Sequence, residues 1–99
     1  MPASGRALAP EVTLGSSTDE DEKSQQPWKT LLWDDPVNTM GQVIFVLTKE
    51  LGMQRLQAEA AMFEAHTNGK AVVYSGEREE AERRALLLFK WLLQATVEQ

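Results

Sequence analysis

Two spacings of apolar residues follow one another along the chain from residue 28 onward. The run 30–33 (Thr-Leu-Leu-Trp) is too short for a helix and predicts a buried strand, which Pro36 ends because proline has no N–H to give a strand ladder. The next apolar residues have the i, i+3, i+4, i+7, i+11 spacing of one helical face. They predict a helix over 39–51, with Asn38 as its N-cap and Gly52 as its stop. The residues of this face are Met40, Val43, Ile44, Leu47 and Leu51.

A second helix is predicted from about Met53 to the pair Asn68-Gly69, which suits a left-handed backbone. It carries two apolar stripes. One consists of Leu56, Ala60 and Phe63, and the other of Ala58, Ala61, Met62 and Ala65. The small residues of the second stripe would let another helix or a ligand come close.

The last third of the chain predicts a strand, a helix and a short closing strand. Residues 70–74 (Lys-Ala-Val-Val-Tyr) have strand composition, and Ser75 is placed to cap the following helix. Glutamates in the first turns of that helix favour its dipole, and Glu79 and Glu80 stand four residues before Arg83 and Arg84. Its predicted buried stripe is Ala81, Ala85, Leu88, Phe89 and Leu92.

Residues 93–98 then supply a third strand, which completes the order β-α-α-β-α-β. This order predicts a small α+β fold in two layers, with helices on one face of a three-stranded antiparallel sheet.

Residues 1–26 differ in composition from the rest. They are rich in Ala, Ser, Gly and Pro and carry an acidic cluster at 19–22, while Leu8, Val12 and Leu14 are scattered without period. Such a segment buries too little surface to offset the entropy cost of ordering, so we expect a disordered tail before a folded domain over 27–99. Composition favours a solubilising leader over an arm that a partner holds.

Composition excludes several classes of protein. A chain of 99 residues with a net charge of −5 lacks the basic face that a nucleic-acid binder needs. No apolar run approaches the roughly 20 residues that span a bilayer, and no secretory signal begins the chain. The lack of cysteine suits a reducing compartment, so we expect a cytoplasmic protein without a membrane partner.

Catalytic motifs are also missing. One histidine and no cysteine do not make a structural zinc site or an iron triad, and there is neither a Gly-x-Ser-x-Gly elbow nor a phosphate-binding glycine loop. We therefore expect no cofactor, no metal and no enzymatic activity.

A binding site is better supported. Asp34 and Asp35 stand in the turn between the first strand and the first helix, and His66, at the end of the second helix, is placed to point at the same turn. Carboxylates beside a neutral imidazole accept hydrogen bonds from an ammonium group, which donates three. Met40 and Met62 suit an adaptable apolar pocket next to them. Each feature alone is also explained by a cap, a helix dipole or core packing, so the prediction rests on their combination.

The same residues carry a resemblance to a known family. Asp34-Asp35 followed by Thr39-Met40, and then the run 62–71 (Met-Phe-Glu-Ala-His-Thr-Asn-Gly-Lys-Ala), resemble the ClpS family of protease adaptors. The similarity runs without gaps from about Lys29 to Arg84 and returns at 95–98. The sequence of the acidic turn, Asp-Asp-Pro-Val-Asn at 34–38, is similar to that of the actinobacterial type, whose ATPase partner is ClpC.

The resemblance implies roles for individual residues. The family's Asn-Asp-Asp turn, which contacts the α-amino group of a substrate together with the helix histidine, corresponds to Asp34, Asp35 and Pro36, and the histidine to His66. The family's surface for the Clp ATPase corresponds to Glu79 and Arg84. Its side-chain pocket corresponds to Thr39, Met40, Val43, Met62, Ala65 and Leu93, with Met40 as the gate against β-branched first residues.

The function that the resemblance implies is that of a non-catalytic adaptor. Such a protein binds substrates with a free N-terminal Phe, Leu, Trp or Tyr (an N-degron) and delivers them to a Clp ATPase of the ClpC or ClpA type for degradation. The alternative is a structural interaction domain that resembles the C-terminal domain of the ribosomal stalk protein. A stalk-like domain needs neither His66 nor paired acids, so a pocket for a free N-terminus distinguishes the two.

Overall fold

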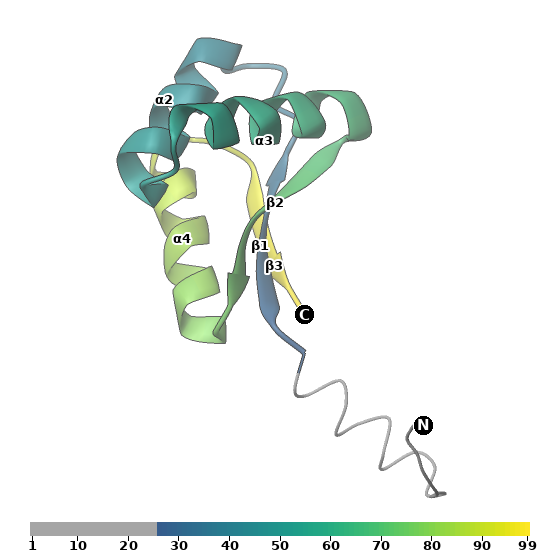
Figure 1. Cartoon of the computed structure of the whole chain (residues 1–99), viewed down its shortest axis with the longest axis vertical. Helices are drawn as coiled ribbons and strands as arrows, with labels where there is room; N and C mark the ends of the chain where they lie inside the picture. Colours follow the sequence, from purple (N-terminus) through teal and green to yellow (C-terminus); the bar gives the residue numbers. More distant parts are fainter. Residues whose placement is uncertain (1–25) are drawn as a thin grey trace, which may run out of the picture.

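The computed structural model describes residues 26–99, and the predicted tail, apart from Gln26, lies outside the described residues. The predicted order of elements is confirmed (Figure 1). The strands are β1 (Trp28–Trp33), β2 (Lys70–Gly76) and β3 (Ala95–Glu98). The helices are α2 (Met40–Leu51), α3 (Arg55–Asn68) and α4 (Arg78–Lys90).

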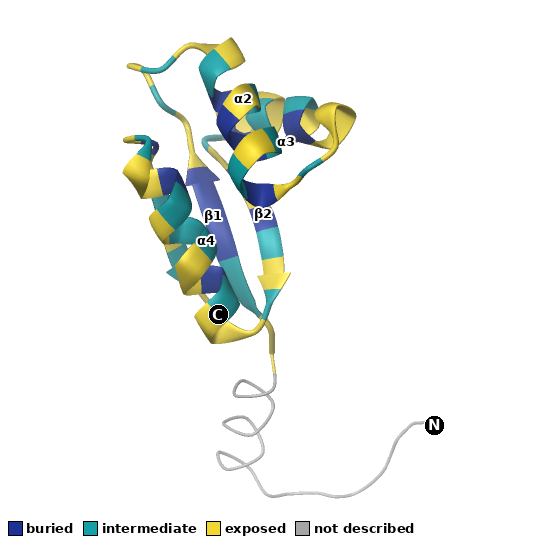
Figure 2. Cartoon of the chain, turned by 90° about the vertical axis from the view of Figure 1, so that its left-hand side faces the viewer, coloured by how far each residue is buried: buried dark blue, intermediate teal, exposed yellow. Residues whose placement is uncertain are grey.

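The three strands form the predicted antiparallel sheet, in the order β2-β1-β3. The central strand β1 is paired on both sides and covered by α4, so Thr30, Leu31 and Leu32 are almost fully buried (Figure 2). The hydroxyl of Thr30 donates to the carbonyl oxygen of Ala81 at 2.8 Å, which ties β1 to α4. Because β1 is held in this way, the position of the turn that follows it is fixed.

Two predicted helix caps are wrong. The N-cap of α2 is Thr39, whose hydroxyl accepts from the Gln42 N–H at 3.1 Å, because the Asn38 side chain is engaged in the preceding turn. The N-cap of α4 is Glu77 and not Ser75, because β2 continues to Gly76. The predicted stops are confirmed, since Gly52 and Gly69 both have left-handed backbones.

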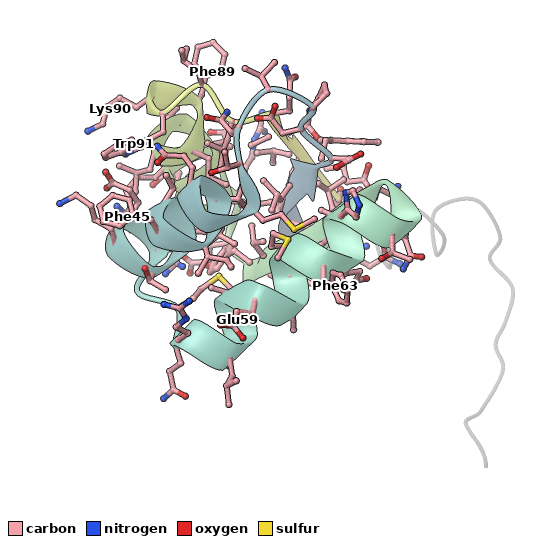
Figure 3. All side chains as sticks on the ribbon, turned by 90° about the horizontal axis from the view of Figure 1, so that it is seen from above. Phe45, Glu59, Phe63, Phe89, Lys90 and Trp91 are labelled. Atoms are coloured by element: carbon pink, nitrogen blue, oxygen red, sulfur yellow. The ribbon has the colours of Figure 1, made fainter. Side chains whose placement is uncertain are left out.

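The core lies between the helices and the sheet, and small residues bring α3 and α4 close to it. Of the two stripes on α3, the one with small residues faces the core, with Ala58, Ala61 and Ala65 buried. The stripe with Leu56 and Phe63 faces outward (Figure 3). On α2, Val46 is fully buried although the predicted face did not include it.

The predicted burial of Phe89 and Leu92 is wrong. Their exposed fractions are 64% and 76%. The helix α4 ends at Lys90, so its periodicity does not extend to Leu92, and α4 rests on the sheet through Ala81 and Leu88. Trp91 packs against the core and makes an edge contact with Phe45, with 5.8 Å between ring centroids (Figure 3).

Within residues 26–99, no helix is both long and apolar enough to cross a membrane. The same residues contain no group of three or more His, Cys, Asp or Glu side chains arranged to hold a metal ion.

Candidate functional site

The acidic turn lies between the end of β1 and the start of α2, and its backbone is anchored on both sides. The N–H of Trp33 donates to the carbonyl oxygen of Gln94 at 2.9 Å, just before β3. The N–H of Asp34 donates to the carbonyl oxygen of Gly69 at 2.9 Å, at the junction of α3 and β2. These two bonds bring the turn, the end of α3 and the start of β3 to one place.

The side chains of Asp34 and His66 meet at this place, as the sequence predicts. The Oδ1 atom of Asp34 lies 3.5 Å from Nδ1 of His66, and both side chains are about half exposed. This distance exceeds the 2.7–3.2 Å that is usual for an N–H···O bond, so the two groups do not saturate one another. Both remain able to accept hydrogen bonds from a ligand that comes from solvent.

The Asp35 carboxylate is bonded within the turn. Its Oδ1 accepts from the backbone N–H groups of Val37 (2.8 Å) and Asn38 (3.2 Å), and its Oδ2 accepts from the Asn38 amide at 2.7 Å. Burial acts to raise the pKa of this carboxyl, but the bonds from the Asn38 side chain and from the two backbone N–H groups outweigh it and hold the pKa below its ordinary value of 3.8. Asp35 therefore stays ionised and shapes the turn that presents Asp34.

A pocket of about 40 Å³ opens beside these acids. Its polar end carries the two aspartates and His66, and its wall is apolar. Seven of the predicted site residues come together here, namely Asp34, Asp35, Met40, Val43, Met62, Ala65 and His66. The pocket has room for roughly three water molecules, at 10–15 Å³ each. Met40 and Met62 are unbranched and flexible, so rotation of their side chains would enlarge it.

Two predicted pocket residues, Thr39 and Leu93, are not among those that line this pocket. The hydroxyl of Thr39 caps α2, and Leu93 is buried in the core with 1% of its surface exposed. Three lining residues were not among the predicted ones, namely Leu32, Trp33 and Asn38. Leu32 and Trp33 directly precede the acidic turn, so the strand pattern could have indicated them. The position of the Asn38 side chain depends on its bond to Asp35, which a pattern does not reveal.

The arrangement suits one kind of ligand. An ammonium group donates three hydrogen bonds and carries a positive charge, which matches acceptor oxygens and an imidazole at the polar end. The adjoining apolar wall suits a hydrophobic side chain attached close to that ammonium. The N-terminal residue of a peptide has both parts.

The two α4 residues predicted to face an ATPase have different surroundings. Arg84 donates to the Glu80 carboxylate at 2.6 Å and to the Leu51 carbonyl oxygen at 3.4 Å, and its guanidinium lies 4.6 Å from the centre of the Tyr74 ring. Hydrogen bonds from Arg83 and Arg84 lower the pKa of Glu80 from 4.5 to about 2. Glu79 is exposed. The predicted pair of Glu80 with Arg84 is confirmed, whereas Arg83 pairs with Glu80 and not with Glu79.

Comparison with known protein families gives a match over most of the chain. Residues 23–91 match the family model described as ATP-dependent Clp protease adaptor protein ClpS. The ClpS adapter of Rhodococcus opacus is 39% identical over 101 residues, which cover 100% of this chain and 86% of the relative. The ClpS adapter of Corynebacterium efficiens is 40% identical over 90 residues, which cover 91% of this chain and 87% of the relative.

A solved structure has a similar fold. It is the structure of Agrobacterium tumefaciens ClpS2 bound to L-phenylalaninamide, with a TM-score of 0.67 and 29% sequence identity. The similarity covers 74% of this chain and 95% of that protein.

Proposed function

The chain belongs to the ClpS family of ATP-dependent Clp protease adaptor proteins, and from this we propose that its acidic pocket binds the free N-terminal residue of proteins destined for degradation. The observation that carries the proposal is the meeting of Asp34 and His66 at the mouth of a pocket with an apolar wall. The ligand of the similar Agrobacterium protein, L-phenylalaninamide, has a free amino group next to an aromatic side chain. The substrate class is therefore N-degrons that begin with Phe, Leu, Trp or Tyr.

Each part of the pocket has a role in this proposal. Asp34 and His66 accept hydrogen bonds from the α-ammonium group, and the ionised Asp35 adds negative charge while it holds the turn in shape. The first side chain lies against an apolar wall formed by Met40, Val43, Met62 and Ala65. Charge-assisted bonds contribute about 1.5–3 kcal/mol each, so the ammonium group supplies much of the affinity.

The adaptor role requires a second surface, for the ATPase. We assign Glu79 and Arg84 on α4 to this surface and a Clp ATPase of the ClpC or ClpA type as the partner. Support comes from the exposure of Glu79 and from the similarity to actinobacterial relatives. An adaptor that works with such an ATPase acts in the cytoplasm.

A degradation assay tests delivery. A fluorescent protein that begins with Phe is incubated with a purified actinobacterial Clp ATPase and its protease, with and without this chain. We expect faster loss of fluorescence with the chain present, and no acceleration for the same protein beginning with Gly. The His66→Ala variant is the matched control and should lose the acceleration. Equal rates for both substrates would contradict the proposal.

A further inference from the structure

The wall of the pocket contains two methionines, and one of them is open to solvent. Met40 and Met62 both line the pocket. Met40 is the first residue of α2, directly after the cap residue Thr39, and 46% of its surface is exposed. Met62 lies on α3, is only partly exposed and packs against the core. Of the two side chains, that of Met40 is therefore the more accessible to a small reagent from solvent.

Met53 provides a comparison within the same chain. Like Met62, it is partly buried against the core, but it lines a separate hollow between α3 and β2 and not the pocket beside the acidic turn. Among the methionines of residues 26–99, Met40 alone combines an exposed side chain with a position in the pocket wall. A chemical change at its sulfur would act directly on what the pocket can hold.

We propose that Met40 is a modification site, at which a hydroperoxide oxidises the thioether to the sulfoxide and thereby weakens the binding of N-degrons. The sulfur uses one of its electron pairs to form a bond to one oxygen of hydrogen peroxide, and the O–O bond breaks. The departing hydroxide takes the proton of the transferred oxygen and leaves as water. The sulfur is thus oxidised by two electrons and the peroxide is reduced by two, without another reactant.

The inference rests on the proposed function, because it concerns the pocket that holds the first side chain of the substrate. The thioether is apolar and flexible, whereas the sulfoxide is polar and carries an additional oxygen. The pocket measures about 40 Å³, so this oxygen narrows it. A Phe side chain bound there would also separate the sulfoxide oxygen from water, which opposes binding.

Oxidation differs in its effect from loss of the side chain. Met40→Ala would widen the pocket, whereas the sulfoxide is larger than the thioether and crowds it further. The oxidised chain should therefore bind a Phe peptide less tightly and still reject a peptide that begins with Ile.

The experiment treats the full chain with hydrogen peroxide and removes the reagent before binding is measured. Mass spectrometry of proteolytic peptides gives the oxidised fraction at Met40, Met53 and Met62. Fluorescence anisotropy then measures the affinity for labelled peptides that begin with Phe or with Ile. We expect Met40 to be oxidised first, and its oxidation to weaken binding of the Phe peptide at least about tenfold. Treatment with methionine sulfoxide reductase should restore the affinity.

Two leucine variants assign the effect to one sulfur. Met40→Leu has an apolar side chain without sulfur, so peroxide should not change the affinity of this variant from its own untreated value. Met53→Leu is the matched control and should remain as sensitive to peroxide as the parent, because Met53 does not line the pocket. The melting temperature of the oxidised parent should equal that of the untreated parent, which separates an effect on the pocket from an effect on folding.

The outcomes distinguish this inference from the proposed function. Unchanged affinity for the Phe peptide at full oxidation of Met40 would overturn the inference, as would equal peroxide sensitivity in Met40→Leu or slower oxidation of Met40 than of Met53 and Met62. Gain of Ile binding on oxidation would overturn it too, since the sulfoxide would then have turned away from the pocket. Failure of the untreated chain to bind the Phe peptide would contradict the proposed function, and the inference with it.

Discussion

At the scale of single residues, two neighbouring aspartates have different tasks. The Asp35 carboxylate accepts three hydrogen bonds from Val37 and Asn38, whereas Asp34 faces His66 at 3.5 Å with about half of its side chain exposed. The first arrangement stabilises the turn, and the second leaves acceptors for a ligand. The division matters because, by the correspondence that the resemblance implies, Asp34 stands where the family's turn has Asn and Pro36 where it has a second Asp.

Substitutions should separate these tasks. Asp34→Ala should leave the melting temperature unchanged and weaken the binding of a Phe peptide, whereas Asp34→Asn, which keeps an acceptor, should weaken it less and flatten its salt dependence. Asp35→Ala should also lower the free energy of unfolding, by about 1 kcal/mol, because Asn38 and Val37 lose their acceptors. Thermal unfolding and peptide titration at low and high salt measure both effects. Parent-like binding by Asp34→Ala, with loss only in Asp35→Ala, would show that Asp35 holds the ligand.

Met40 is proposed to select the shape of the first side chain. It lines the pocket and is 46% exposed, so it is placed to crowd a branched β-carbon. Met40→Ala should therefore let peptides that begin with Ile or Val bind, with little change for Phe. Competition against a labelled Phe peptide measures this. Continued rejection of Ile and Val, together with normal Phe binding, would reduce Met40 to a packing residue.

The sequence predicts the meeting of Asp34 and His66. A strand, a short turn and two helices leave few positions that the end of the second helix can take relative to the acidic turn. The sequence does not predict the bonds of Asn38. One of them reaches Leu92, 54 residues further along the chain, and depends on tertiary structure. The pocket residues on helical faces were therefore easier to predict than Asn38, whose hydrogen bonds fix the turn beside the pocket.

At the scale of elements, α4 combines packing with a proposed docking surface. Arg84 is bonded to Glu80 and Leu51 and stacked on Tyr74, so it connects α4 with α2 and β2. Glu79 is exposed one turn earlier. The two residues assigned to one surface should thus respond differently to substitution.

Arg84→Ala should lower the free energy of unfolding by roughly 1 kcal/mol, because it removes a charged hydrogen bond and a cation–π contact. Glu79→Lys should leave stability unchanged. Both variants should weaken binding to the isolated ATPase while peptide binding persists. Calorimetric unfolding and a pull-down with the ATPase measure the two properties. Undiminished ATPase binding by Glu79→Lys would remove that residue from the surface.

The apolar periodicity predicts the existence and order of the elements but only part of their buried faces. On α3 the pattern offered two stripes, and the small residues Ala58, Ala61 and Ala65 face the core because the helix packs closely there. On α4 the predicted stripe continued to Leu92, past the end of the helix at Lys90. Which side of a helix meets the sheet, and where the helix ends, depends on contacts with distant segments.

At the scale of the whole molecule, the pocket that residues 26–99 form lies next to the end of β1 from which the chain continues into α2. The described residues begin with Gln26, before β1, at the other end of this strand. At that end the carbonyl oxygen of Gln26 accepts a hydrogen bond from the Gln99 side chain at 3.1 Å. Binding and delivery can therefore be separated by truncation.

Deletion of residues 1–25 should leave peptide affinity and melting temperature unchanged, because residues of the described part of the chain, 26–99, form the pocket and the core. Delivery should slow, because the resemblance to the ClpS family implies that this segment is an arm that the ATPase holds. The degradation assay with a Phe-initiated substrate compares the truncated and full chains at equal occupancy. Equal degradation rates would reduce the segment to a solubilising leader.

The central claim is that the pocket recognises a free α-amino group, and one pair of peptides tests it. Titration of the full chain with a Phe-initiated peptide and with its acetylated form compares binding with and without the ammonium charge. Loss of two charge-assisted bonds of roughly 1.5–3 kcal/mol each predicts at least a hundredfold weaker binding of the acetylated form. Equal affinity for the two peptides would contradict the account.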